Sequence, residues 1–254
     1  MGIGGLSHQE KSLQIKRFMD ALEKEGLSWT RIDLLSHLDY VFQDIPTFVG
    51  KSMLDVGGGH GLYSLYAACC GADHATILEP EFAGSRKGTF YRFQRLLRHL
   101  SLRNVSFEPI RFQDFDAGGS VFDIILLYDS INHLDEEACV RLQYDAVSRG
   151  RYSEIFRRLS RVSSYRAKLI VGDCSRDNFF ARLGIRNPFA PSINWEKHQS
   201  PHFWSRILSD YGFTNAKIRW TPPKFRGRTA RRLLGNPVIS YFTTSHFILV
   251  MEKQ

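Results

Sequence analysis

The chain has 254 residues but only four cysteines and no long hydrophobic run. None of the cysteines forms a C-x-x-C pair, and neighbouring cysteines in an expected helix act more often as small buried hydrophobic residues than as a disulfide. We therefore expect reduced thiols. Because no stretch approaches about 18 consecutive apolar residues, we also expect no membrane-spanning helix. The four cysteines are Cys69, Cys70, Cys139 and Cys174.

The first residues lack the marks of a targeting signal. The segment MGIGGLSHQEK has no basic start followed by a long apolar block, and Leu6 stands where a myristoylation motif requires Ser or Thr. Hydrophobic residues make up 43% of the chain and charged residues 24%, which is ordinary for a globular protein. Together with the expected reduced thiols, these features favour a cytoplasmic protein with one main domain.

Acidic residues are in deficit, and the net charge is +8. The cations concentrate in two segments, and in the first the spacing is typical of the solvated face of a helix. The second, at 222–236, is a Pro- and Gly-containing loop that could meet RNA phosphates, an acidic membrane surface or a phosphate-bearing small molecule. No RNA-binding module accompanies it, so a nucleic acid partner is disfavoured. The first group is Arg86, Lys87, Arg92, Arg95, Arg98 and Arg103, and the second is Lys224, Arg226, Arg228, Arg231 and Arg232.

What the chain does contain is a glycine-dense turn between two apolar strand patterns. Residues 51–81 read KSMLDVGGGHGLYSLYAACCGADHATILEPE. The run 53–56 is typical of a buried parallel strand, and Gly57, Gly58, Gly59 and Gly61 let the backbone turn sharply and approach a ligand. Glu79 ends the second expected strand, 18 positions after Gly61. A carboxylate at about this separation meets the ribose of a bound nucleoside, so the segment predicts a nucleoside site.

The glycine spacing distinguishes between nucleoside cofactors. A dinucleotide fingerprint, G-x-G-x-x-G, places a pyrophosphate on the N-terminus of the following helix. Here Gly57, Gly59 and Gly61 are evenly spaced, and Asp55 precedes them by two residues. That carboxylate disfavours a phosphate but tolerates an ammonium or a sulfonium group. The pattern D-x-G-x-G-x-G resembles that of the class I S-adenosylmethionine-dependent methyltransferases.

The resemblance covers roughly residues 52–173. The sequence RFQDF at 111–115 falls where this family places an Asp that meets the adenine amino group, and FDIILLYDSINHL at 122–134 resembles its fourth strand and following loop. The resemblance implies S-adenosyl-L-methionine as methyl donor, S-adenosyl-L-homocysteine as product, and a set of cofactor-binding residues. That set is Asp55, Gly57, Gly59, Gly61, Glu79, Pro80, Asp114, Phe115, Tyr128 and Asp129.

Two other functions remain open. Gly59, Gly61 and Ser64 approximate G-x-G-x-x-A, so an NAD-binding oxidoreductase could use Glu79 for its ribose, although Asp55 argues against it. A non-catalytic Rossmann-like binding module is the third interpretation, because a fold does not determine a function.

Alternating strand and helix patterns predict an α/β fold with a parallel, doubly wound sheet. The family resemblance implies that this is a Rossmann-like, mostly parallel seven-stranded sheet with an antiparallel C-terminal strand. Two helical patterns, at 7–25 and 29–41, predict an N-terminal helical cap over 1–48, before a methyltransferase domain over 49–254. Within that domain we expect an insertion at about 175–200 and the basic loop at about 222–236. Later strands are expected near 105–111, 121–127, 168–172, 214–220 and 245–252, and helices at 82–102, from 134 to about 163 with a candidate interruption at Gly150, and at 202–211.

Methyl transfer needs mainly positioning, and a general base where the acceptor must lose a proton. In a doubly wound sheet, reactive groups lie beyond the carboxyl ends of the strands. His133, after the fourth expected strand, is the first candidate for the base, although a helix-cap or core role fits it equally well. His198, in INWEKHQSPHFW, is the second. Asp173 and Cys174 end the fifth expected strand, and the histidine spacings match no zinc signature, so no metal is expected.

We therefore expect a cytoplasmic S-adenosylmethionine-dependent methyltransferase (EC 2.1.1) that acts on a small or medium polar acceptor. Anionic and sugar-linked molecules are candidates for this acceptor. Transfer to oxygen is favoured over transfer to nitrogen. A glycan, lipid-linked or RNA acceptor, met through the basic loop, is the alternative.

Overall fold

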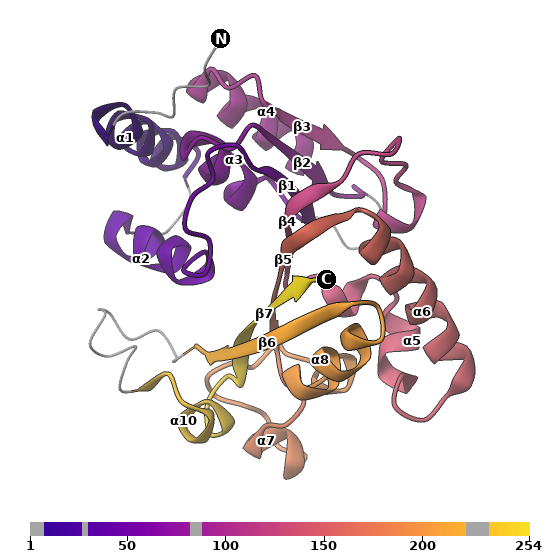
Figure 1. Ribbon diagram of the computed structural model, residues 1–254. Helices are drawn as coiled ribbons and strands as arrows, with labels where there is room; N and C mark the ends of the chain where they lie inside the picture. Colours follow the sequence, from indigo (N-terminus) through magenta and orange to yellow (C-terminus); the bar gives the residue numbers. More distant parts are fainter. Residues whose placement is uncertain (1–7, 27–29, 82–87, 222–233) are drawn as a thin grey trace. The chain divides into compact units, whose positions relative to one another are not determined.

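The computed structural model describes residues 8–26, 30–81, 88–221 and 234–254. Seven strands form a sheet in the order β3-β2-β1-β4-β5-β7-β6 (Figure 1). Strand β1 pairs in parallel with β2 and with β4, β2 pairs in parallel with β3, and β7 is antiparallel to both β5 and β6. This arrangement confirms the predicted mostly parallel sheet with an antiparallel C-terminal strand. The strands are β1 (Ser52–Val56), β2 (His74–Leu78), β3 (Val105–Glu108), β4 (Phe122–Tyr128), β5 (Ser163–Cys174), β6 (Phe213–Trp220) and β7 (His246–Lys253).

The chain forms two compact units that divide after Leu126, within β4. The helices of the first unit are α1 (His8–Lys24), α2 (Arg31–Val41), α3 (Leu62–Cys69), α4 (Thr89–Leu100) and the 3-10 helix η1 (Phe112–Asp114). Those of the second are η2 (Ile131–His133), α5 (Glu136–Arg141), α6 (Ala146–Arg161), α7 (Phe179–Arg182), η3 (Trp195–Lys197), α8 (Pro201–Ser209) and α10 (Pro237–Tyr241). The predicted boundary between a cap and a methyltransferase domain at residue 48 stays a prediction.

The core of the first unit follows from its continuous apolar strands. Met53 and Leu54 of β1 and Ile77 of β2 are fully buried, as expected of parallel strands covered on both faces. Helix α1 packs on α3 through Phe18 and Tyr66, whose ring centroids are 5.8 Å apart. Strands β1 and β2 are therefore buried in the packed core of the first unit.

The core of the second unit is aromatic. The ring centroid of Tyr152 in α6 lies 5.4 Å from that of Phe156 and 5.5 Å from that of Trp204 in α8, and all three side chains are buried. The Tyr152 hydroxyl donates to the carbonyl oxygen of Ile131 at 3.0 Å. Since Ile131 begins the short helix η2, this bond anchors the segment that follows β4.

The predicted interruption at Gly150 is wrong. Gly150 lies inside the continuous helix α6, whereas the break falls at 142–145, where Asp145 caps α6 by accepting from the Ser148 amide at 2.7 Å. Glycine costs a helix interior roughly 1 kcal/mol, and the buried α6 face, with Tyr152 and Phe156, offsets it. The fifth strand begins at Ser163, earlier than predicted, and β3 ends earlier, at Glu108.

Some predictions fall outside the described residues: the start of the helix expected from residue 82, with Arg86 and Lys87, and positions 222–233 of the basic loop with all five of its cations. In α4, Phe93 and Leu96 are buried while Arg95 and Arg98 are exposed, as expected of a solvated helix face. Within the described ranges, no helix combines the length and apolar character needed to cross a bilayer.

Candidate functional site

The turn after β1 is closed by backbone contacts with β2. The Gly57 amide donates to the carbonyl oxygen of Leu78 at 2.7 Å. Gly57, Gly59 and Gly61 have φ values of +73°, +54° and +82°, a left-handed conformation that favours glycine. A Cβ on Gly59 would meet no atom within 4 Å, so the backbone there borders open space.

Asp55 supports this turn from its packed side. A Cβ on Gly58 would lie 2.7 Å from Cγ of Asp55 and 2.9 Å from Cγ2 of Ile77, so only glycine fits there. The Asp55 side chain is buried, its Oδ2 accepts from the Ser64 hydroxyl at 2.9 Å, and its Oδ1 has no partner among the described residues. Burial raises the pKa of Asp55 to about 7, the nearby Glu79 charge adds to the rise, and the Ser64 bond opposes it. Asp55 therefore binds its proton near neutral pH.

Glu79 directly follows β2 and faces the same turn. Its Oε2 accepts from the Gly59 amide at 2.9 Å, which holds the carboxylate beside the part of the turn that borders open space. Pro80, next in the chain, is half-buried. The structure thus brings together Glu79 and the glycines that the sequence singled out.

Asp114 and Phe115 lie after β3, at the end of η1. Asp114 is exposed and its Oδ2 accepts from Nε of Arg111 at 2.8 Å. The Phe115 ring centroid lies 6.4 Å from that of Phe122, at the start of β4.

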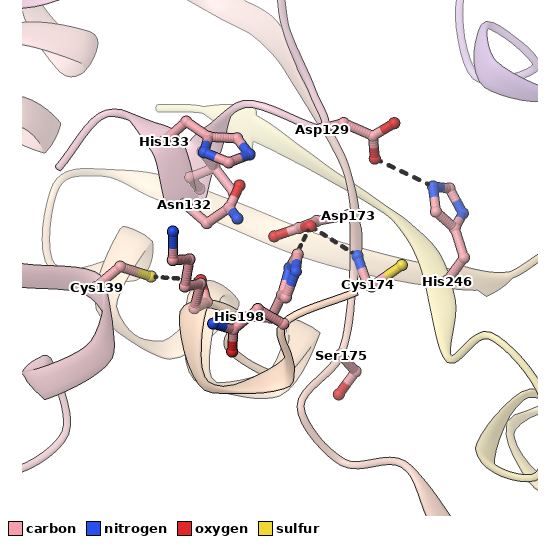
Figure 2. A network of polar contacts seen from close by, with 12 residues as sticks. Asp129, Asn132, His133, Cys139, Asp173, Cys174, Ser175, His198 and His246 are labelled. Atoms are coloured by element: carbon pink, nitrogen blue, oxygen red, sulfur yellow. Dashed lines mark hydrogen bonds and ion pairs between the residues drawn. The ribbon is translucent and has the colours of Figure 1, made fainter. Parts of the chain in front are cut away.

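In the second unit a buried carboxylate meets a histidine (Figure 2). Asp173, near the end of β5, is only 1% exposed, and its Oδ1 lies 2.8 Å from Nδ1 of His198. The same oxygen accepts from the Cys174 amide at 2.7 Å, while Oδ2 has no partner among the described residues. Burial raises the pKa of Asp173, against the lowering effect of His198. When Nδ1 donates to the carboxylate, Nε2 of His198 is left as a proton acceptor.

The predicted insertion holds His198 in place. Gln199 is buried: its Nε2 donates to the carbonyl oxygen of Cys139 at 2.6 Å, and its Oε1 accepts from Nε2 of Gln143 at 2.7 Å. The Cys139 thiol donates to the carbonyl oxygen of Lys197 at 3.3 Å. These bonds attach the insertion to α5 on both sides of His198, so its ring is positioned by the fold.

Two neighbouring residues on η2 differ sharply. Asn132 is 1% exposed, and neither polar atom of its amide has a partner among the described residues. His133 has a 53% exposed side chain, and its Nδ1 lies 2.5 Å from Oε1 of Glu136. Glu136 also accepts from Lys197, and this bond, followed by that of His133, lowers the pKa of Glu136. A buried amide without a partner is costly, and a bound ligand or an ordered water usually satisfies it.

His246 belongs to the polar cluster after β4 although no sequence pattern marked it. Its Nε2 lies 3.7 Å from Oδ1 of Asp129, its Nδ1 lies 3.0 Å from Oγ1 of Thr221, and its ring centroid is 5.5 Å from that of Tyr128. The antiparallel register of β5 and β7, which pairs Cys174 with His246, places it there. The local sequence around His246 contains no motif, because its place in the cluster depends on how β7 pairs with β5.

The structure argues against two further candidates, an activated Cys174 thiol and a metal site. Burial raises the pKa of Cys174 well above its usual value, so its thiol is not activated. Across the ranges that the structure describes, no three His, Cys, Asp or Glu side chains are grouped so as to hold a metal ion.

Comparison with known proteins yields similarity in structure but not in sequence. No protein-family model matches the chain, and no curated protein does. Solved structures do. A SAM-dependent methyltransferase from Aquifex aeolicus is 15% identical with a TM-score of 0.59, over 92% of this chain and 99% of that one. The chain has the class I methyltransferase fold.

Two further solved methyltransferase structures resemble this chain to a similar degree. An S-adenosylmethionine-dependent methyltransferase from Mesorhizobium loti is 14% identical with a TM-score of 0.58, over 87% of this chain and all of that one. The N-methyltransferase NodS from Bradyrhizobium japonicum WM9 is 9% identical with a TM-score of 0.53, over 86% and 93%. At such identities the likeness is one of fold, and the site residues must be argued from their own chemistry.

Proposed function

We propose that this protein is an S-adenosylmethionine-dependent methyltransferase. The observation that carries the proposal is the 2.9 Å hydrogen bond from the Gly59 amide to Glu79, which fixes a carboxylate beside open space at the turn. Such a carboxylate can accept from both hydroxyls of a ribose, and the bare backbone at Gly59 leaves room for a nucleoside. The similar structures from Aquifex aeolicus and Mesorhizobium loti are named for the same cofactor.

The charges around the turn favour this cofactor over NAD. Glu79 accepts from the Gly59 amide, so a pyrophosphate at the turn would meet the negative charge of its carboxylate. A cofactor with a sulfonium and an ammonium group, and no phosphate, avoids that repulsion. We therefore favour methyl transfer over NAD-dependent oxidoreduction as the function.

The remaining cofactor contacts are proposed from the family resemblance. Asp114 and Phe115 would meet the adenine, and Tyr128 and Asp129 the methionine part, with Pro80 next to the ribose. Asp55 is assigned to supporting the turn, because its side chain is buried and bonded to Ser64.

S-adenosylmethionine, when bound, supplies a methyl group already activated on a positively charged sulfur. We propose His198 as the general base: Nε2 takes the proton from an acceptor hydroxyl while Asp173 holds the ring and stabilises its positive charge. The Asn132 amide and Oδ2 of Asp173, which have no partner among the described residues, would form hydrogen bonds with a polar acceptor. A base of this kind favours transfer to oxygen, in a small polar molecule that is anionic or sugar-linked. His133, half exposed and bonded to Glu136, ranks second.

A titration experiment tests the cofactor. S-adenosylhomocysteine and S-adenosylmethionine should each release or absorb measurable heat on binding the full chain in a calorimeter, and NADH should not. If NADH binds tightly and neither sulfur compound binds, the proposal fails.

Substitution of Glu79 tests the contact that carries the proposal. Glu79→Gln should weaken the binding of S-adenosylhomocysteine by roughly 10- to 100-fold, because a neutral amide oxygen replaces a charged acceptor for the ribose. The matched control is Glu108→Gln, at the end of the neighbouring strand β3. Equal affinities for the Glu79 variant and the original protein would remove Glu79 from the site.

A further inference from the structure

Exposed hydrophobic side chains lie on and next to α7 and α10 in the second unit. We define the apolar face by five large hydrophobic residues whose side chains are exposed there. Phe179 joins the two segments, since its ring centroid lies 5.0 Å from that of Phe242. Within the first segment, the ring centroid of Phe180 lies 6.3 Å from that of Phe189. The face consists of Leu183, 57% exposed, Ile185, 51%, Phe189, 54%, Val238, 65%, and Phe242, 47%.

Two buried asparagines hold the face together. The Nδ2 of Asn178 donates to the carbonyl oxygen of Thr243 at 2.8 Å and to Oγ of Ser245 at 2.8 Å. The Nδ2 of Asn187 donates to the same Thr243 carbonyl at 2.6 Å. The segments that carry α7 and α10, adjacent in Figure 1, are thus fixed to one another by hydrogen bonds from buried side chains. Proteins rarely expose a large contiguous hydrophobic patch unless that patch binds another molecule.

The charge at this face has one sign. Arg182 and Arg186 are exposed, and neither forms an ion pair with a described residue. Residues 178–192 and 234–245 include no Asp or Glu, and Asp177 precedes the first of these segments. A two-fold contact between two copies would bring arginines against arginines with no acidic residue of the face to pair them. The face instead matches a partner that is both apolar and anionic.

We propose that the apolar face binds the surface of an anionic phospholipid bilayer. The five hydrophobic side chains would enter the boundary between headgroups and acyl chains, and Arg182 and Arg186 would meet the lipid phosphates. Binding of this kind is reversible and needs no membrane-spanning helix. The proposal rests on the hydrophobic residues and arginines of this face and not on the methyl-transfer chemistry, so it holds whether or not the proposed function does.

Vesicle flotation tests the proposal on the full chain. The protein should float with phosphatidylcholine vesicles in which about a third of the lipid is phosphatidylglycerol, and much less with phosphatidylcholine alone. Phe189→Ser with Phe242→Ser should lower the partition coefficient at least about 10-fold, because the apolar contribution is lost. Arg182→Gln with Arg186→Gln should lower it roughly 25-fold on the anionic vesicles, about fivefold for each arginine.

The matched control is Tyr144→Ser with Val147→Ser. These residues are 69% and 67% exposed in the same unit but lie outside the face, and the double variant should float like the original protein. Thermal melting of each variant shows that it is folded. Absence of flotation at low salt overturns the proposal, as does flotation that the face variants leave unchanged. If the original protein is a dimer in solution that only the face variants dissociate, and no variant floats, the face serves contact between copies and the proposal is wrong.

Discussion

Replacing His198 with alanine is expected to lower methyl transfer by roughly 100- to 10,000-fold while leaving the affinity for S-adenosylhomocysteine unchanged. The reason is that Nε2 is the proposed acceptor of the substrate proton, and Nδ1 is held 2.8 Å from the buried Asp173 carboxylate. Turnover is measured as S-adenosylhomocysteine formed with the best acceptor from a panel of hydroxyl-bearing sugars and phenols, and cofactor affinity by calorimetry.

Three further measurements separate a base from a merely structural histidine. Added imidazole should restore part of the activity of His198→Ala, because the vacated volume admits a free base. Asp173→Asn should lower turnover with cofactor affinity intact, because an amide can hold the ring in the wrong tautomer. His133→Ala is the matched histidine control, on an exposed side chain, and should have the smaller effect. Full activity in His198→Ala together with loss in His133→Ala would reverse the assignment.

Asp55→Asn is expected to change how the stability of the protein depends on pH. Burial raises the pKa of Asp55 to about 7 in the folded state, from an ordinary 3.8. Between these values the folded state binds a proton that the unfolded state has lost, so the free energy of unfolding falls as pH rises from about 4 to about 7. An asparagine cannot ionise and escapes this loss. Relative to the variant, the original protein should lose about 3 kcal/mol of stability between about pH 5 and about pH 8.

Urea denaturation of both proteins at the two pH values measures this difference. Asp173 has a pKa shifted in the same direction, so the comparison must be between variant and original protein at each pH. Asp73→Asn, at an exposed aspartate of the same unit, is the control and should leave the pH dependence as it is. A constant difference between Asp55→Asn and the original protein across the range would show that Asp55 ionises normally in the folded state.

Much of the fold was predictable because its signals are local. The apolar runs that became β1 and β2, the spaced glycines between them and Glu79 all lie within residues 51–81, and each acts on the backbone where it stands. Alternation of strand and helix patterns then predicted the parallel, doubly wound sheet, and the family resemblance implied its antiparallel last strand. The wrong prediction of a helix break at Gly150 shows the limit of local preferences. The free energy gained by burying one face of α6 exceeds the cost of one glycine inside the helix.

The sequence by itself determined the glycine turn, the carboxylate that faces it and the order of strands and helices, since chain neighbours and hydrophobic periodicity are written in consecutive residues. Only the tertiary structure decided that Asp173 meets His198, that His246 meets Asp129, and that Asp55 is buried with a raised pKa. These outcomes depend on strand register and on the hydrogen bonds that attach the insertion to α5. Contacts between residues far apart in the chain exist only once the sheet has aligned them, and burial exists only once the core has closed.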